Sequence, residues 1–230
     1  LREPRMSLTD TQLDDVLWSA RTGDVEAWNE IINQVDIHVA LSASNDMGNS
    51  ALHYAAANGH LDLMQQVLPK TNLDMLLSRN EAGNTPLHWA AFNGHLEVAE
   101  SLVNRIEALE TQDEPSARRL REQEDRREHE RHAEKNKDTE GESEDARKAE
   151  LAHHDELQSE RALWDVRNKA GRGPMSEAQM SDREGVVQML LRHLSGEKGT
   201  QNSTDAGSAS ESAPTVDVES RTGKLSVSDT

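Results

Sequence analysis

ALHYAAANGHLDL, residues 51–63, returns almost unchanged as TPLHWAAFNGHLEV at residues 85–98. Each copy follows a turn that contains a glycine, Gly48 or Gly83, so the period is 35 residues. A fixed period of about 20–50 residues marks a repeat architecture, in which each unit buries its apolar face against its neighbours. The sequence therefore predicts a stack of short helical units.

Within each copy the apolar residues follow the 3.6-residue period of a helix. Ser50 and Thr85 precede the first helix, where a hydroxyl can cap free backbone N–H groups, and Pro86 suits a first turn that needs no donor. Gly94 follows that helix, where glycine readily adopts the left-handed conformation that ends it. The residues expected to face inward in the second copy are Leu87, Ala90, Ala91, Leu96, Val98, Ala99 and Leu102.

The string T-P-L-H-x-A at residues 85–90, with its turn and two helices, resembles the ankyrin repeat. Residues 13–34 resemble an N-terminal capping repeat that lacks this string, and residues 168–194 resemble a degenerate last repeat. In that last repeat Ser176 and Asp182 replace the expected histidine and glycine. The resemblance implies an all-α ankyrin-repeat solenoid of about four repeats, whose concave surface holds another protein.

Two segments break the regular spacing. Residues 104–163 form a long insertion of charged residues before the last repeat, which we expect to be flexible or partly helical. The tail, 195–230, is rich in serine, threonine and glycine and is expected to be disordered, as are residues 1–10. Repeats one to three then occupy 11–103 and the capping repeat 164–194.

The composition disfavours several classes of protein. Cysteine is absent, which excludes disulfides and thiolate zinc sites and fits the cytoplasm and nucleus. No apolar run approaches the ~18 residues of a membrane-spanning helix. The formal charge of −18 disfavours direct binding to nucleic acid and to anionic membranes. We expect a monomer that binds a basic protein.

Four histidines, His53, His60, His88 and His95, recur at the repeat period. A metal or acid–base site is one interpretation, but the recurrence favours a structural role in which each ring bonds backbone and cap groups. A further cluster at 153–156 (HHDE) lacks the supporting partners of a real metal site. No phosphate-binding loop, nucleophile–base pair or catalytic carboxylate pair is present. We therefore expect no enzymatic activity, no cofactor and no metal.

The candidate binding residues follow from the repeat geometry. In an ankyrin stack the turn tips and the exposed side of the first helices line the concave surface. Aromatic anchors in an acidic surround suit a basic partner, although Tyr54 and Trp89 could instead only pack between repeats. The tip candidates are Asp46, Met47, Asn49, Glu81 and Asn84, and the first-helix candidates are Tyr54, Asn58, Trp89, Phe92 and Asn93.

The order of these elements resembles the fungal ankyrin-repeat chaperones of the Yar family. The matching stretches are ARTGDVE (20–26), ALHYAAANGH (51–60), NEAGNTPLHWAAFNGHLEV (80–98) and RNKAGRGPMSEAQ (167–179). The resemblance implies a dedicated chaperone of small-subunit ribosomal protein S-three, which keeps that client soluble for nuclear import and 40S assembly. The long insertion and the only mildly acidic tail depart from the family pattern.

A rival interpretation is an ankyrin scaffold, or an inhibitor of a transcription factor or of a ubiquitin-ligase component. Such proteins normally carry a further domain, and the sequence patterns of this chain indicate none. The two interpretations differ in the partner that they predict.

Overall fold

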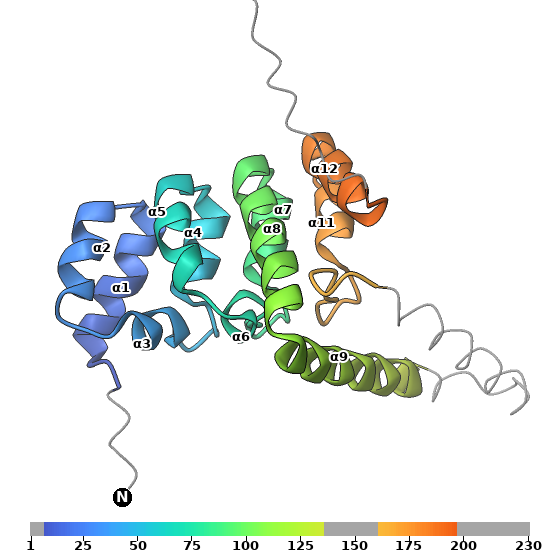
Figure 1. The fold of residues 1–230 in the computed structure, drawn as a ribbon, viewed down its shortest axis with the longest axis horizontal. Coiled ribbons are helices and arrows are strands. Elements are labelled where there is room, and N and C mark those ends of the chain that lie inside the picture. Colours follow the sequence, from blue (N-terminus) through green and yellow to red (C-terminus); the bar gives the residue numbers. More distant parts are fainter. Residues whose placement is uncertain (1–6, 136–160, 197–230) are drawn as a thin grey trace, which may run out of the picture. The chain divides into compact units, whose positions relative to one another are not determined.

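Pairs of helices stack side by side through residues 7–135 and 161–196, the part of the chain that the computed structural model describes (Figure 1). Each pair holds a first and a second helix joined by a tight turn, and four such pairs follow one another. The first helices are α1 (Asp10–Thr22), α4 (Ala51–Asn58), α7 (Pro86–Asn93) and α11 (Pro174–Met180). The second helices are α2 (Val25–Ile32), α5 (Leu61–Val67), α8 (Leu96–Gln112) and α12 (Glu184–Leu194).

Shorter elements link the pairs. α3 (Ile37–Ser42), a 3-10 turn (Leu68–Lys70) and α6 (Leu73–Leu76) lie in the connections, and α9 (Glu114–Lys135) follows α8. No strand occurs in the described residues, where one isolated bridge joins Ser44 and Ser50. The predicted all-α solenoid of four repeats is confirmed.

The local sequence explains where the first helices begin and end. Ser50 and Thr85 are N-caps, and their backbone N–H groups donate to Nδ1 of His53 (3.2 Å) and of His88 (3.1 Å). α1 uses the same arrangement with Gln12, whose Oε1 accepts from Thr9 N–H at 3.0 Å. Histidine in the repeated string is therefore a capping residue, as the sequence predicted.

The turns between first and second helices need a left-handed residue. Gly59 has φ +74°, and a Cβ there would lie 2.4 Å from the ring of His95, so glycine is required both by the backbone and by the neighbouring repeat. In the last repeat Asp182 takes this position with φ 56°. Aspartate adopts this conformation more readily than most non-glycine residues, so the degenerate repeat keeps its turn.

One apolar core runs through all four repeats. Alanines on the first helices let neighbouring repeats approach closely, and large side chains from the second helices fill the space behind them. Fully buried members include Ala20, Ala56, Ala90, Ala91 and Ala178 on the first helices, and Trp28, Leu63, Met64, Leu102, Ile106 and Met189 on the second. Burying each large aliphatic side chain contributes roughly 1.5–3 kcal/mol.

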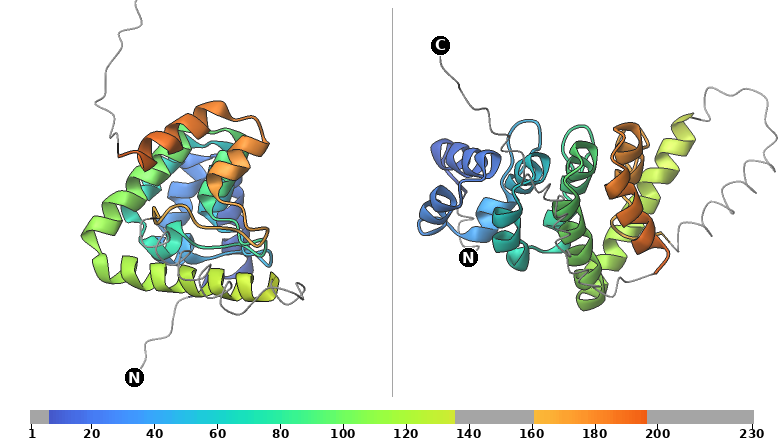
Figure 2. Two further views of the ribbon diagram at one scale, coloured as in Figure 1. Left: turned by 90° about the vertical axis from the view of Figure 1, so that its right-hand side faces the viewer. Right: turned by 90° about the horizontal axis from the view of Figure 1, so that it is seen from above.

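The charged insertion begins later than the sequence predicted. The expected boundary at residue 103 falls inside α8, whose Ile106 and Leu109 are still buried. After Asp113 the chain turns sharply, and α9 runs nearly crosswise to α8 at one edge of the stack (Figures 1 and 2). Residues 136–160, which hold the HHDE cluster, lie outside the described residues, as do 1–6 and 197–230.

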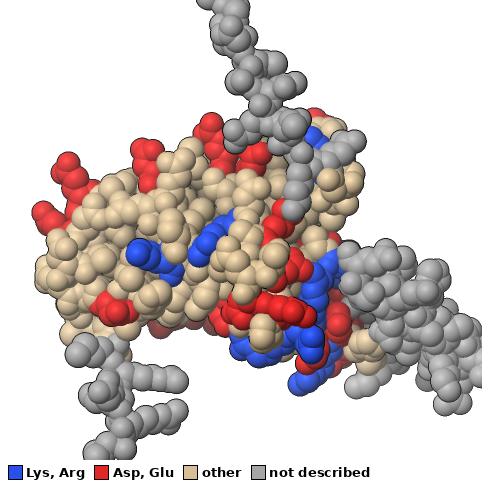
Figure 3. All heavy atoms as spheres, in the orientation of Figure 1, with Lys and Arg blue, Asp and Glu red and all other residues tan. Residues whose placement is uncertain are grey.

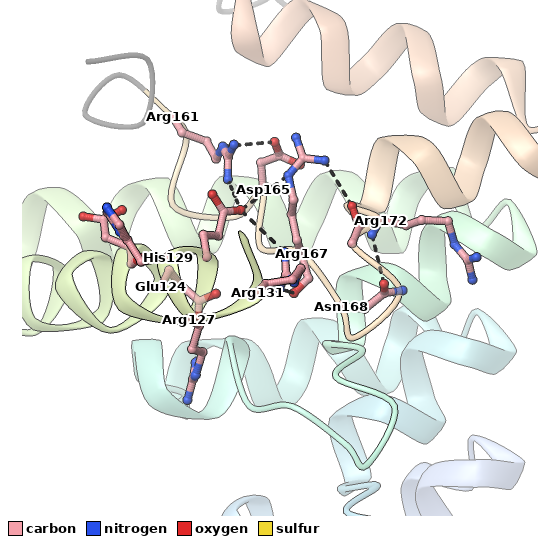
Figure 4. Close-up of polar contacts among 12 residues, drawn as sticks. Glu124, Arg127, His129, Arg131, Arg161, Asp165, Arg167, Asn168 and Arg172 are labelled. Atoms are coloured by element: carbon pink, nitrogen blue, oxygen red, sulfur yellow. Dashed lines mark hydrogen bonds and ion pairs between the residues drawn. The ribbon is translucent and has the colours of Figure 1, made fainter. Parts of the chain in front are cut away.

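α9 is joined to the stack by charged groups as well as by its buried Ala117 and Leu120. Its Glu128 is 3% exposed and pairs with Arg161 (2.5 Å) and Arg167 (3.4 Å), which precede the last repeat. Figure 4 shows these two arginines reaching toward α9. Arg79, from the preceding connection, pairs with Glu124 at 3.2 Å and also donates to the Arg167 carbonyl. α9 thereby links the third and fourth repeats.

Candidate protein-binding face

Three turns, which we call the fingers, precede the first helices of repeats two to four at 45–50, 80–85 and 168–173. Each is closed by an asparagine whose Oδ1 accepts two backbone N–H bonds, as Asn80 does from Ala82 (3.0 Å) and Asn84 (2.9 Å). The fingers are also joined to one another, because Glu81 N–H donates to the Met47 carbonyl at 2.9 Å and Lys169 N–H to the Ala82 carbonyl at 3.0 Å. They form one continuous edge.

The finger tips carry exposed charged side chains. Asp46 and Glu81 are exposed at equivalent positions, and Met47 beside them is 56% exposed. In the third finger the equivalent residue is Lys169, which is exposed as well. The edge is thus acidic at two fingers and basic at the third.

The first helices carry a row of aromatic side chains. Trp18, Tyr54 and Trp89 each lie five residues before the left-handed turn residue, so they occupy the same place on three adjacent helices. Trp18 is 64% exposed. Phe92, 45% exposed, meets Trp89 edge to face with ring centroids 6.3 Å apart. Trp18, Tyr54, Trp89 and Phe92 are called the aromatic row below.

Three asparagines and one tyrosine that were predicted to bind a partner also make hydrogen bonds within the scaffold. Asn49 accepts from Asn80 (2.9 Å) and Asn84 accepts from Asn168 (2.8 Å), so these side chains join successive fingers. Asn93 donates to the Ala57 carbonyl of the preceding repeat at 2.8 Å. Tyr54, whose hydroxyl accepts from Asn45, is half-buried.

Asn58 also bonds within its own repeat, because its Nδ2 donates to the Tyr54 carbonyl at 2.8 Å. It remains exposed. Among the predicted residues, the exposed side chains are Asp46, Met47, Asn58, Glu81 and Phe92, while Asn49, Tyr54, Asn84, Trp89 and Asn93 are half-buried.

Trp18 is a candidate that the sequence analysis missed. The repeat alignment could have identified it, since Gly23 occupies the place of Gly59 and Gly94 and Trp18 therefore aligns with Tyr54 and Trp89. No finger precedes the capping repeat, so the candidates, which were chosen from the finger glycines onward, did not include it. Met180, 67% exposed near the end of α11, was missed as well, because the last repeat is the most degenerate.

The buried histidines are neutral scaffold. Burial lowers the pKa of His53 and of His88 to about 4, against the opposing effect of their backbone hydrogen bonds. Because Nδ1 of each ring accepts from the N-cap, Nε2 is the donor, to the Asn84 carbonyl (3.0 Å) and to the Arg172 carbonyl (3.1 Å). Each ring therefore connects its helix cap to the next finger.

His60 and His95 have the corresponding role at the other end of the first helices. Their Nε2 atoms lie 2.8 Å from the Arg21 carbonyl and 3.0 Å from the Ala57 carbonyl of the preceding repeat. In the last repeat Arg183 replaces this histidine, and its Nε donates to the Phe92 carbonyl at 3.2 Å. The structural interpretation of the four histidines is confirmed.

The charge of the stack changes along its length. Residues 1–103 contain 14 acidic and 5 basic residues, a net charge of −9. Figure 3 shows acidic side chains along the upper edge of the stack, and acidic and basic side chains mixed over α9. Residues 161–196 contain six basic and four acidic residues, a net charge of +2.

In residues 7–135 and 161–196 no three histidine or carboxylate side chains gather as metal ligands would. No described helix is both long and apolar enough to cross a bilayer.

Known proteins support the ankyrin assignment. Residues 16–113 match the family model described as ankyrin repeats (3 copies), which is less than half of the chain. An ankyrin repeat-containing protein of Schizosaccharomyces pombe is 36% identical over 64 residues. That match covers 28% of this chain and 42% of the relative, so the chain spans less than half of the relative's length.

A solved structure is similar over a larger share of the chain. It is the crystal structure of the yeast ribosomal protein Rps3 in complex with its chaperone Yar1, with a TM-score of 0.53 and 23% identity. The similarity covers 81% of this chain and 95% of the matched chain of that structure. At this level of identity the likeness concerns the fold, and the fold is an all-α ankyrin-repeat solenoid.

Proposed function

We propose that this protein is a chaperone that holds a basic small-subunit ribosomal protein of the Rps3 type. The client would bind on the face formed by the finger tips and the exposed sides of the first helices, which we call the first-helix face. The observation that carries the proposal is the aromatic row together with the acidic finger tips Asp46 and Glu81. The exposed members of the row, Trp18 and Phe92, supply contact area at little cost in side-chain entropy, and the carboxylates of Asp46 and Glu81 attract a basic partner. The likeness to the complex of Rps3 with Yar1 supports the same assignment.

The proposed role follows from the physical chemistry of the client. A ribosomal protein outside the ribosome carries uncompensated positive charge and surfaces made for RNA, so it binds nucleic acid nonspecifically and aggregates. An acidic face screens that charge without contacting nucleic acid itself. Ribosomal RNA, with a denser negative charge, then displaces the chaperone during assembly. On this proposal the protein works as a monomer, without catalysis, in the cytoplasm and nucleus.

The charge contribution predicts a salt-dependent affinity. Raising the salt concentration from about 50 to 300 mM shortens the Debye length from roughly 14 to 6 Å. We therefore expect the dissociation constant for the purified client to rise at least about tenfold. Fluorescence anisotropy with a labelled client measures this change. An affinity that does not respond to salt would contradict the electrostatic part of the proposal.

The aromatic row predicts which side chains anchor the client. Trp89→Ala and Trp18→Ala should each weaken binding by about 10–30-fold, because truncating a central aromatic anchor costs roughly 2 kcal/mol. Leu194→Ala is the matched control, since Leu194 is also an exposed apolar side chain (47%) but lies at the end of α12.

Circular dichroism must show that each variant keeps the fold. If both tryptophan variants bind the client as tightly as the control, the first-helix face is not the binding surface. Affinity purification from the native organism then identifies the partner. Enrichment of transcription or ubiquitin-ligase components in place of a ribosomal protein would favour the scaffold interpretation.

A further inference from the structure

The first-helix face changes its chemistry at the fourth repeat. Three repeat positions can be followed along the stack, and each switches at the same point. At the finger tip, Asp46 and Glu81 give way to Lys169. At the fifth residue of the finger, Asn49 and Asn84 give way to Arg172.

The third position is that of the aromatic row. Trp18, Tyr54 and Trp89 are followed by Glu177, five residues before the left-handed Asp182. Glu177 is 6% exposed and accepts hydrogen bonds from Asn168 (2.7 Å) and Arg172 (2.8 Å), so its negative charge is paired within the repeat. The aromatic row therefore ends at the third repeat, and a neutralised carboxylate takes its place.

Lys169 carries the uncompensated positive charge of this finger. Its side chain is exposed, and no ion pair involving it is present among the described residues. The Arg172 side chain is 41% exposed, but its charge is paired with Glu177 through Nε, so Arg172 offers a ligand only its remaining N–H donors. Since finger 168–173 is hydrogen-bonded to finger 80–85, these cations lie beside the acidic tip Glu81 on one continuous edge.

We infer that the face is bipolar, and that it fits a polypeptide segment that is basic and apolar along repeats one to three and carries a carboxylate side chain opposite Lys169 and Arg172. The inference rests on the proposed function for the site and adds the direction in which the segment lies. A uniformly basic segment would meet like charge at the fourth repeat, which disfavours both its binding there and the reversed orientation.

Charge reversal at one residue distinguishes this arrangement from attraction by net charge alone. Lys169→Glu makes the protein more acidic, so net charge predicts tighter binding of a basic client. The bipolar face predicts the opposite, about three- to fivefold weaker binding at low salt, with Lys169→Gln in between. Lys70→Glu is the matched control, because Lys70 is an exposed lysine at the end of the 3-10 turn and belongs to none of the three fingers. It should leave affinity unchanged or raise it slightly.

Cross-linking gives the orientation directly. A benzophenone amino acid placed at position 46 or 169 is irradiated with purified Rps3-type client and, separately, with a lysate of the native organism. Mass spectrometry should place the position-46 cross-links in a lysine- or arginine-rich stretch and the position-169 cross-links beside aspartate or glutamate. Lack of ribosomal-protein cross-links in both samples contradicts the proposed function.

The residues that flank the cross-links test the bipolar face independently of the client's identity. Position-169 cross-links in a basic stretch or in nucleic acid, or tighter client binding by Lys169→Glu, would overturn it.

Discussion

Histidines 53 and 88 make the stability of the stack depend on pH. Their pKa values are lowered to about 4 in the folded chain by burial, whereas an unfolded histidine titrates near 6.5. Above about pH 6.5 these histidines are neutral in both the folded and the unfolded chain, so the difference between their pKa values does not affect stability. As the pH falls toward 4, these histidines become protonated in the unfolded chain but stay neutral in the folded chain. The free energy of unfolding therefore decreases, by up to roughly 3 kcal/mol for each histidine.

A glutamine variant tests this dependence. His88→Gln should keep the cap, because Gln12 caps α1 in the same way, but it cannot titrate. We expect the variant to lose less stability than the parent protein between pH 7.5 and pH 5, measured by urea unfolding. At pH 7.5 it should be about 1 kcal/mol less stable, if the bond to the Arg172 carbonyl is lost. Equal losses in the two proteins would mean that His88 does not carry the effect.

Residue roles were predictable where the repeat itself supplies the comparison. The caps, the turn glycines and the four histidines could be read from their recurrence. The asparagines could not, because Asn49, Asn84 and Asn93 look like surface residues in the sequence and reveal their bonds to other repeats only in three dimensions. Trp18 lay within reach of the same alignment.

At the scale of elements, α9 was the least predictable part of the described chain. Its sequence offers an almost uninterrupted run of charges, with Ala117 and Leu120 as its buried apolar contacts. Charge runs usually form solvated faces, and nothing in the local pattern shows that Glu128 is buried. Arg131 pairs with it from the same helix at 3.9 Å, but the two arginines that approach it more closely, Arg161 and Arg167, lie more than thirty residues away in the sequence.

Glu128→Gln tests whether this ion cluster attaches α9. The amide keeps the shape of the side chain but removes the charge with which Arg161 and Arg167 pair, so the attachment of α9 is weakened. We expect faster amide hydrogen exchange in α9 and in the finger 168–173, with α1 and α4 unchanged. Glu130→Gln is the control, since Glu130 is exposed on the same helix. Unchanged exchange in α9 would show that apolar contacts alone hold it.

For the whole molecule, repeat order and inter-repeat bonds explain how one face can carry a partner along several units. Successive fingers and first helices present equivalent positions, so a substitution at one repeat changes the local chemistry without changing the scaffold. The fold was predictable at this level because the repeats copy one another. The sequence alone shows basic residues at the finger positions of the fourth repeat, Lys169 and Arg172. That they lie on the same edge as the acidic tips follows only from the hydrogen bonds that join the fingers.

The interruption after α8 also affects the order in which the protein can be completed. About eighty residues separate the end of α8 from the end of α12. A ribosome adds roughly 5–20 residues per second, so several seconds pass between the synthesis of α8 and that of the helices that cover its far side. During this interval the apolar surface of α7 and α8 lacks its last partner. The newly made chain is then itself exposed to aggregation, for about as long as the translation of the insertion takes.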